Sequence, residues 1–232
     1  MISQSGKSSE TLWCAELFEN IVAITNDLKS PLATHPSALF SIDLCAGEEK
    51  YSSTKTYINS LIVLYLGLGF DPESIIDRLE LELAEFEKTG RNWAEETFQI
   101  IERGEWKGAC ILGDGPNLAS AMQAALILTE STGFPFQAMS LAQFDHGPKE
   151  SSPGSLIYII SPQNHPSHRM NELSRQIIKA GAIVSVLNIK GEEHLTPLTS
   201  SVPFFFFAHF LSEKLGRNYP FLIGGKITEV DS

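Results

Sequence analysis

The chain has 232 residues, a net charge of −11, 43% hydrophobic residues and 19% charged residues. This size allows one large domain or two small ones with a full core, and the composition is that of a globular protein rather than a disordered one. The acidic balance argues against nucleic-acid and anionic-membrane partners, because both need clustered Lys and Arg. The 3 cysteines are widely spaced and contain no CxxC pair, so the sequence favours neither a disulfide framework nor a metal site.

Nothing in the sequence predicts a signal peptide or a membrane span. The longest strongly apolar run covers 61–70, far short of the ~20 residues that cross a bilayer. We therefore expect a cytoplasmic protein.

The first eleven residues, MISQSGKSSET, place hydroxyl side chains and one glycine ahead of a helix predicted over Thr11–Asn20. Gly6 lets the backbone turn close to a ligand, and a helix start offers free N–H groups, so this pattern suits a phosphate. The candidate donors are Ser3, Gln4, Ser5 and Ser8. On spacing alone, a serine-rich segment that caps a helix is the alternative.

Short apolar runs then alternate with helical patterns along the chain. The predicted strands are Ile21–Thr25, Ser41–Cys45, one beginning near Lys107 and ending at the turn Leu112–Gly115, Ser155–Ser161 and Ala182–Asn188. The predicted helices are Ser53–Phe70, which we expect to be buried, Pro72–Thr89, Asn92–Arg103, Asn117–Glu130, Ser167–Ala180 and Pro203–Leu215. Strands that alternate with helices predict an α/β fold with a mainly parallel sheet.

The pattern also repeats along the chain. Ile2–Ser5, a helix and the run IVAITN match Ile160–Gln163, a helix and the run AIVSVLN. The second copy has a leading strand and helix that the first copy lacks, which predicts two tandem copies, the first truncated at its N-terminus. The expected domains are 1–70 (partial first copy), 71–106 (helical connector), 107–216 (second copy) and 217–232 (tail).

These motifs together resemble a known family. The segment Ile2–Leu12 resembles a phosphate loop of the form ISQSG-[ET]-x-x-[DE]-T-L, and it is followed in order by SPLA (Ser30–Ala33), AGEE (Ala46–Glu49), STKTY (Ser53–Tyr57), LGDG (Leu112–Gly115) and QFDHGP (Gln143–Pro148). The chain is thereby similar to the tandem sugar isomerase (SIS) domain proteins, including the isomerase half of glucosamine-6-phosphate synthase and the fructosamine-6-phosphate deglycases. The resemblance implies three-layer, flavodoxin-like SIS domains that bind a phosphorylated sugar or amino sugar, with no cofactor.

The resemblance also implies roles for single residues. Ser3, Gln4, Ser5 and Ser8 fall on phosphate-binding positions, and Ser53 falls on a sugar contact, with an N-cap of the following helix as the alternative. Glu130 falls on the carboxylate that shuttles a proton, His146 on the imidazole that opens the sugar ring, and Lys226 on a lysine that reaches the sugar carbonyl, where a solvated tail lysine is the alternative. The implied assembly is a homodimer in which His146 comes from the neighbouring subunit.

Two departures from the pattern leave the reaction open. Gln123 and Ile127 stand where the synthase has a carboxylate and a lysine. The implied activity is therefore aldose–ketose isomerisation or deglycation of a fructosamine 6-phosphate, without glutaminase activity. The alternative is a binding module or remnant that performs no catalysis.

Overall fold

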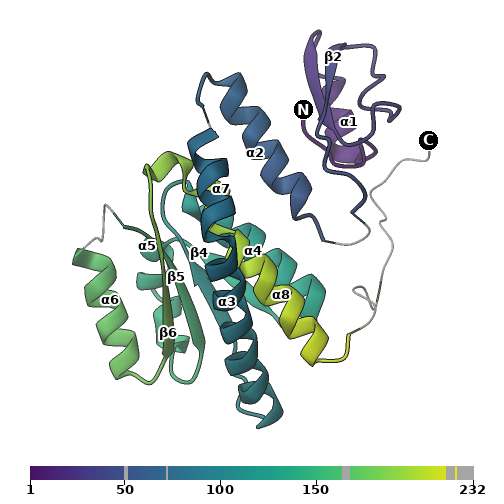
Figure 1. Ribbon diagram of the computed structural model, residues 1–232. Helices are drawn as coiled ribbons and strands as arrows, with labels where there is room; N and C mark the ends of the chain where they lie inside the picture. Colours follow the sequence, from purple (N-terminus) through teal and green to yellow (C-terminus); the bar gives the residue numbers. More distant parts are fainter. Residues whose placement is uncertain (50–51, 72, 164–167, 218–222, 224–232) are drawn as a thin grey trace. The chain divides into compact units, whose positions relative to one another are not determined.

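The computed structural model describes residues 1–49, 52–71, 73–163, 168–217 and 223. The chain divides into two compact units, the first containing Met1–Asp71 and the second containing Pro72–Pro220. Each unit is described by itself below (Figure 1).

The first unit is built on a small parallel sheet. Strands β1 (Ile21–Thr25) and β2 (Ala38–Asp43) pair in parallel. Ile2 forms a parallel bridge with Ile24, whose backbone N–H donates to the Met1 carbonyl at 2.8 Å. The opening residues therefore extend this sheet, and the chain leaves it at Ser3 beside the carboxyl end of β1.

Apolar contacts on the two faces of this sheet hold the unit together. Ala15 of helix α1 (Ser9–Ala15) packs with Ile21, Ala23 and Leu32. On another side, Val63 of helix α2 (Lys55–Gly67) packs with a separate cluster formed by Ile24, Leu44 and Ala46. Each of the two clusters thus combines strand residues with a residue of one helix.

The predicted burial of the helix over Ser53–Phe70 was wrong. Within α2 only Thr56 is buried, and Leu64 and Leu66 are exposed. The helix is apolar on all sides, but the short sheet contacts it on one side alone. Hydrophobicity without a polar face therefore did not predict full burial.

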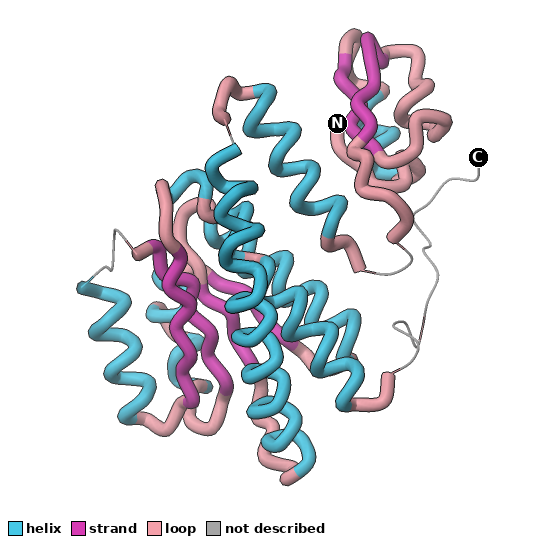
Figure 2. The backbone as a smooth tube through the Cα atoms, viewed as in Figure 1, coloured by secondary structure: helices cyan, strands magenta, loops and turns pink. Residues whose placement is uncertain are grey.

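The second unit contains a four-stranded parallel sheet (Figure 2). Its strands are β3 (Ala109–Leu112), β4 (Phe136–Met139), β5 (Leu156–Pro162) and β6 (Ile183–Ile189), in the spatial order β4-β3-β5-β6. This order is that of the first four strands of a doubly wound, flavodoxin-like sheet. In such a sheet the second strand lies on one side of the first strand, and the later strands are added on its other side.

Helices cover both faces of this sheet, which makes three layers (Figure 1). Tyr158 of β5 lies against Trp93 of α3 (Glu73–Glu102) and Phe207 of α8 (Val202–Lys214), with ring centroids 5.1 and 5.3 Å apart. Helix α4 (Asn117–Thr132) packs against α8 on the same face. On the other face, Ile157 and Ile159 pack with residues of α5 (Leu141–Asp145) and α6 (His168–Lys179). The short elements η1 (Pro148–Ser151), η2 (Glu193–Leu195) and α7 (Pro197–Ser200) complete the unit.

The predicted α/β class with parallel strands is confirmed, and several element predictions are corrected. Helix α1 ends at Ala15 rather than Asn20, and β2 begins at Ala38 rather than Ser41. Strand β4 and helix α5 had no counterpart in the prediction, because each is only 4 or 5 residues long. The truncated first copy and the predicted domain limits stay predictions.

One continuous helix, α3, replaces the two helices predicted over Pro72–Thr89 and Asn92–Arg103. Gly90 lies within it without breaking it. A Cβ atom at Gly90 would lie 2.6 Å from both the Phe206 Cβ and the Pro203 carbonyl oxygen of α8. Glycine is required here because the two helices approach closely, so this residue marks a packing contact rather than a helix end.

The substitution Gly90→Ala tests this close contact. We expect it to lower the free energy of unfolding by about 1–3 kcal/mol, since the added methyl group has no space between α3 and α8. Gly67→Ala is the control, because no atom lies within 4 Å of a Cβ at that helical glycine. Denaturant unfolding should show the control unchanged or more stable, whereas a Gly90→Ala protein as stable as the wild type would exclude the contact as the reason for glycine.

Candidate functional site

The segment Ser3–Ser8 forms a closed loop between the sheet of the first unit and α1. Gly6 has a positive φ of 65°, and its backbone N–H donates to the Ser3 Oγ at 3.1 Å. The next backbone N–H, that of Lys7, donates to the Ser5 Oγ at 3.3 Å. The chain therefore folds back on its own serine side chains, which brings the hydroxyl groups of the loop together.

Hydrogen bonds fix this loop to its surroundings on two sides. The Gln4 carbonyl accepts from the Thr25 hydroxyl at 3.2 Å and from the Asn26 backbone N–H at 3.0 Å. The Gly6 carbonyl accepts from the Leu32 backbone N–H at 3.0 Å. The loop conformation is thus set by the end of β1 and by the turn that follows it.

Ser30 is a residue of this site to which the sequence analysis gave no role. A Cβ at Gly6 would lie 2.4 Å from the Ser30 Cβ and 2.0 Å from its Oγ. Ser30 is only 1% exposed, and its Oγ accepts from the Ala33 backbone N–H. Its position in the SPLA segment was the available signal, since that segment is part of the family resemblance.

The predicted phosphate ligands differ in how deeply they are buried in the loop. Ser3 is 8% exposed, and its Oγ lies 3.2 Å from that of Ser8. Gln4, Ser5 and Ser8 are half-buried. Ser3 therefore forms the inner wall of the loop, while the other three lie closer to solvent.

Ser53 does not cap α2, so that alternative was wrong. The N-cap is Thr54, and the carboxylate of Glu49 accepts the backbone N–H groups of Thr54, Lys55 and Thr56 at 2.9, 2.6 and 3.1 Å. Partial burial acts to raise the pKa of Glu49, but the hydrogen bonds from Thr56 and Thr54 outweigh it and hold the pKa below its usual range. A glutamate, rather than a hydroxyl residue, satisfies the helix start.

Glu130 and His146 lie in the second unit, on opposite sides of its sheet. Glu130 is half-buried in the last turn of α4, and His146 is exposed directly after α5. Because α4 and α5 cover different faces, one copy of this unit does not bring the two side chains together. Lys226 lies outside the described residues.

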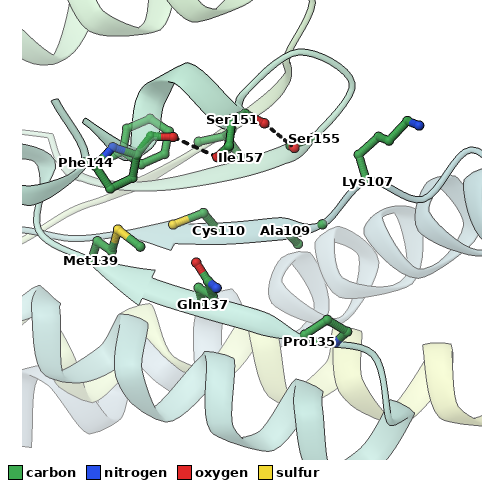
Figure 3. A pocket seen from close by; sticks show the side chains of 12 residues that line it. Lys107, Ala109, Cys110, Pro135, Gln137, Met139, Phe144, Ser151, Ser155 and Ile157 are labelled. Carbon is green, nitrogen blue, oxygen red and sulfur yellow. Dashed lines mark hydrogen bonds between the residues drawn. The ribbon is translucent and has the colours of Figure 1, made fainter. Parts of the chain in front are cut away.

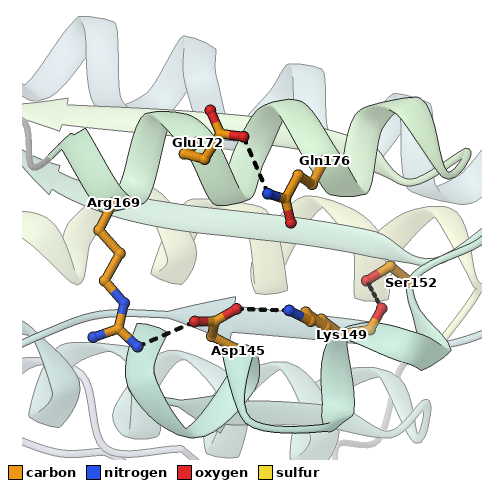
Figure 4. A network of polar contacts seen from close by, with 6 residues as sticks. All are labelled: Asp145, Lys149, Ser152, Arg169, Glu172 and Gln176. Atoms are coloured by element: carbon orange, nitrogen blue, oxygen red, sulfur yellow. Dashed lines mark hydrogen bonds and ion pairs between the residues drawn. The ribbon is translucent and has the colours of Figure 1, made fainter.

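A network of polar contacts holds the segment that carries His146 (Figure 4). The Asp145 carboxylate accepts from the Lys149 Nζ at 2.9 Å and from the Arg169 Nη2 at 3.2 Å. Hydrogen bonds from Lys149 and then from Arg169 lower the pKa of Asp145. The pairs are partly solvated and contribute little stability, but they tie α5 to η1 and to the first turn of α6.

A separate cavity of about 280 Å³ lies between β3, β4 and the segment after α5 (Figure 3). Cys110, Gln137, Met139 and Phe144 are among the residues that line it. Burial raises the pKa of the Cys110 thiol to about 12, so this thiol stays protonated at neutral pH. The described lining contains no carboxylate or imidazole, and the cavity therefore lacks a base for proton transfer at carbon.

Within the described residues, no group of three or more His, Cys, Asp or Glu side chains is placed to hold a metal ion. None of the helices in the described ranges has both the length and the apolar character that crossing a membrane requires.

The contact between Gly6 and Ser30 can be tested directly. We expect Gly6→Ala to abolish measurable binding of a phosphate ester, because the added Cβ would displace either the loop or Ser30. Adding Ser30→Gly to this variant removes the obstructing side chain and should restore part of the binding, leaving about 1–2 kcal/mol of backbone strain. Gly69→Ala is the control for positive φ alone, since nothing lies within 4 Å of its Cβ. Calorimetric titration with fructose 6-phosphate measures the affinity of the wild type and of these three variants. A double variant that binds no more tightly than Gly6→Ala would contradict the steric explanation.

Comparison with known proteins was made at three levels. No protein-family model matches the chain. Among curated proteins, the glutamine–fructose-6-phosphate aminotransferase (isomerizing) of Aquifex aeolicus is 26% identical over 243 residues, which cover 93% of this chain and 40% of that protein. The chain thus spans two fifths of the length of this relative.

Solved structures match over most of the chain. A protein named as a phosphosugar isomerase from Silicibacter pomeroyi superposes with a TM-score of 0.73 at 25% identity, covering 93% of this chain and 71% of that one. The C-terminal domain of glucosamine-fructose-6-phosphate aminotransferase from Francisella tularensis gives a TM-score of 0.71 at 19% identity, covering 93% and 70%. The second match shows a shared fold, and the first adds sequence similarity.

These matches confirm the resemblance drawn from the motifs. The chain is similar in sequence to glutamine–fructose-6-phosphate aminotransferase (isomerizing), and it has the α/β fold of the C-terminal domain of such an enzyme and of a structure named as a phosphosugar isomerase.

Proposed function

We propose that this protein binds a phosphorylated sugar or amino sugar through the loop Ser3–Ser8. The observation that carries the proposal is the geometry of this loop, in which Gly6 holds a positive φ against Ser30 and the Ser3 and Ser8 hydroxyls lie 3.2 Å apart. Clustered hydroxyl donors at the end of a parallel strand suit the oxygens of a phosphate group. In this proposal Gln4, Ser5 and Ser8 contact the phosphate, Ser3 supports them from inside, and Ser53 contacts the sugar.

The two units are, in this proposal, copies of one SIS fold. The pairing of Ile2 with Ile24 next to β2 parallels the pairing of Ile160 with Leu187 in the second unit. In both places a strand ends beside its parallel neighbour and is followed by a helix. The repeated sequence pattern supports the same relationship.

The proposed reaction is aldose–ketose isomerisation or deglycation of a fructosamine 6-phosphate. In isomerisation, a base removes the proton from C2 of the open-chain aldose and a proton is delivered to C1, while the hydroxyl proton at C2 moves to the C1 oxygen. We assign the base to the Glu130 carboxylate. His146 would move protons between the ring oxygen and the anomeric hydroxyl when the ring opens, which suits an imidazole near neutral pH. Lys226 is proposed as a hydrogen-bond donor to, or an amine partner of, the sugar carbonyl.

A homodimer with shared sites fits the placement of these groups. Glu130 and His146 come from helices on opposite faces of one sheet, so a site that uses both needs the histidine of a second chain. A twofold dimer would then form two equivalent sites.

The alternative is a protein that binds a sugar phosphate without turning it over. One feature of α4 favours it: Ile127, which stands at the lysine position of the synthase, is buried in the core, and Gln123 at the carboxylate position carries no charge. Two charges of the synthase pattern are therefore replaced, and a buried isoleucine cannot serve in proton transfer.

Incubation with fructose 6-phosphate and with a fructosamine 6-phosphate distinguishes the two functions. The enzyme function predicts product from at least one of them, and Glu130→Gln should lower kcat by about 10²-fold or more. Thermal stabilisation by either ester without any turnover would favour the binding module. Ser5→Ala should weaken that stabilisation, and full stabilisation of the Ser5→Ala protein would contradict the assignment of the phosphate loop.

Mixing two inactive variants tests the shared site. Glu130→Gln and His146→Asn proteins, each inactive alone, should regain about a quarter of wild-type activity when unfolded and refolded together. Half of the dimers are then mixed, and each mixed dimer contains one intact site out of two. No recovery, with mixed dimers demonstrated by differently tagged chains, would show that both groups act from one chain or that one of them is not needed.

A further inference from the structure

Lys7 belongs to the loop but was given no role above. It is the one Lys or Arg among the first eleven residues, in a chain with a net charge of −11. Its backbone N–H donates to the Ser5 Oγ, and it is half-buried. The side chain therefore starts from a backbone position within the loop that is held by the Ser5 hydroxyl.

The Lys7 ammonium has no ion-pair partner among the residues that the structure describes. Some other lysines of the chain do have one: Lys149 pairs with Asp145, Lys190 with Glu82, and Lys214 with Glu95. An uncompensated cation in the loop of an acidic protein attracts anions at that point, whatever the net charge.

Some neutral donors of the loop are already used. The backbone N–H groups of Gly6 and Lys7 donate to Ser3 and Ser5, and the Ser3 and Ser8 hydroxyls face each other. The backbone N–H groups of Gly6 and Lys7 are therefore not free to bind a ligand in this conformation. Charge-assisted hydrogen bonds are about twice as strong as neutral ones, so an ammonium contributes most where neutral donors are few.

We propose that Lys7 makes the loop selective for a dianionic phosphate monoester over a monoanionic ester of the same sugar. The inference rests on the proposed phosphate-binding function and adds the residue that sets the charge preference. A serine loop without this lysine would hold either ester by hydrogen bonds of similar number, since both present three terminal oxygens. With the lysine, the second negative charge gains an additional attraction.

Glucose 6-phosphate and glucose 6-sulfate are suitable probes, because they share one sugar and differ in charge. Calorimetric titration of the full chain should show the phosphate binding about tenfold or more tightly than the sulfate. Lys7→Gln should weaken phosphate binding by about tenfold and sulfate binding much less, and Lys7→Arg should keep most of the preference. Lys179→Gln removes the same charge from an exposed position on α6 and should bind both esters like the wild type.

These binding measurements test the role of Lys7 separately from the proposed enzymatic reaction. Unchanged phosphate binding by Lys7→Gln, equal losses for both esters, or no binding of either ester by the wild type would overturn it. If Ser5→Ala loses binding while Lys7→Gln keeps it, phosphate binding stands and the role of Lys7 falls. If binding depends on Lys7 but neither sugar substrate is turned over, the role of Lys7 stands and the proposed reaction falls.

Discussion

The close contact between Gly6 and Ser30 is the constraint on which the candidate site depends. At 2.4 Å from a buried side chain, the position of a Cβ on Gly6 is forbidden, so the loop can approach the turn after β1 only with glycine. That approach aligns the Gly6 carbonyl with the Leu32 N–H and the Gly6 N–H with the Ser3 hydroxyl. The hydroxyl cluster is therefore a consequence of backbone packing and needs no ligand to assemble it.

The turn that follows β3 in the second unit has a different chemistry. After β3, the Asn117 side chain is fully buried and bonds to the hydroxyls of Thr196 and Ser200 at 2.8 and 3.0 Å. Asp114 accepts the Leu141 backbone N–H, and a Cβ at Gly115 would lie 3.1 Å from the Glu193 Oε1. A carboxylate repels a phosphate, and an amide that is already hydrogen-bonded has no donor left for it. The first unit instead offers hydroxyls and an ammonium. Of these two turns, the loop Ser3–Ser8 therefore suits an anion better than the turn after β3.

The sequence predicted the elements of the fold correctly where local pattern and tertiary packing agree. The run Ile21–Thr25 is a strand with the predicted bounds, because a short apolar stretch between polar turns suits a buried parallel strand. Gly90 misled the prediction, since a glycine within a helical pattern indicates a break, and only the position of α8 reveals that it serves helix contact. Ser30 was missed for the same reason: its role depends on a residue 24 positions away in the chain that the fold brings against it. Ser3 and Ser8 lie 3.2 Å apart in the loop predicted from their spacing in sequence, and their role as phosphate ligands stays a prediction.

The three-layer architecture also sets what a single chain can do. With right-handed crossovers, helices lie on opposite faces of a parallel sheet where the strand order changes direction, and α4 and α5 lie on either side of such a change at β4. A carboxylate on one and an imidazole after the other are separated by the sheet itself, which has nearly every side chain of β3 and β5 buried. Moving either group to the opposite face would require unfolding that core. Chemistry that uses Glu130 and His146 on one sugar therefore calls for a second copy of the chain, and the Asp145 network with Lys149 and Arg169 then serves to hold the exposed histidine at a fixed place on the surface that a partner would meet.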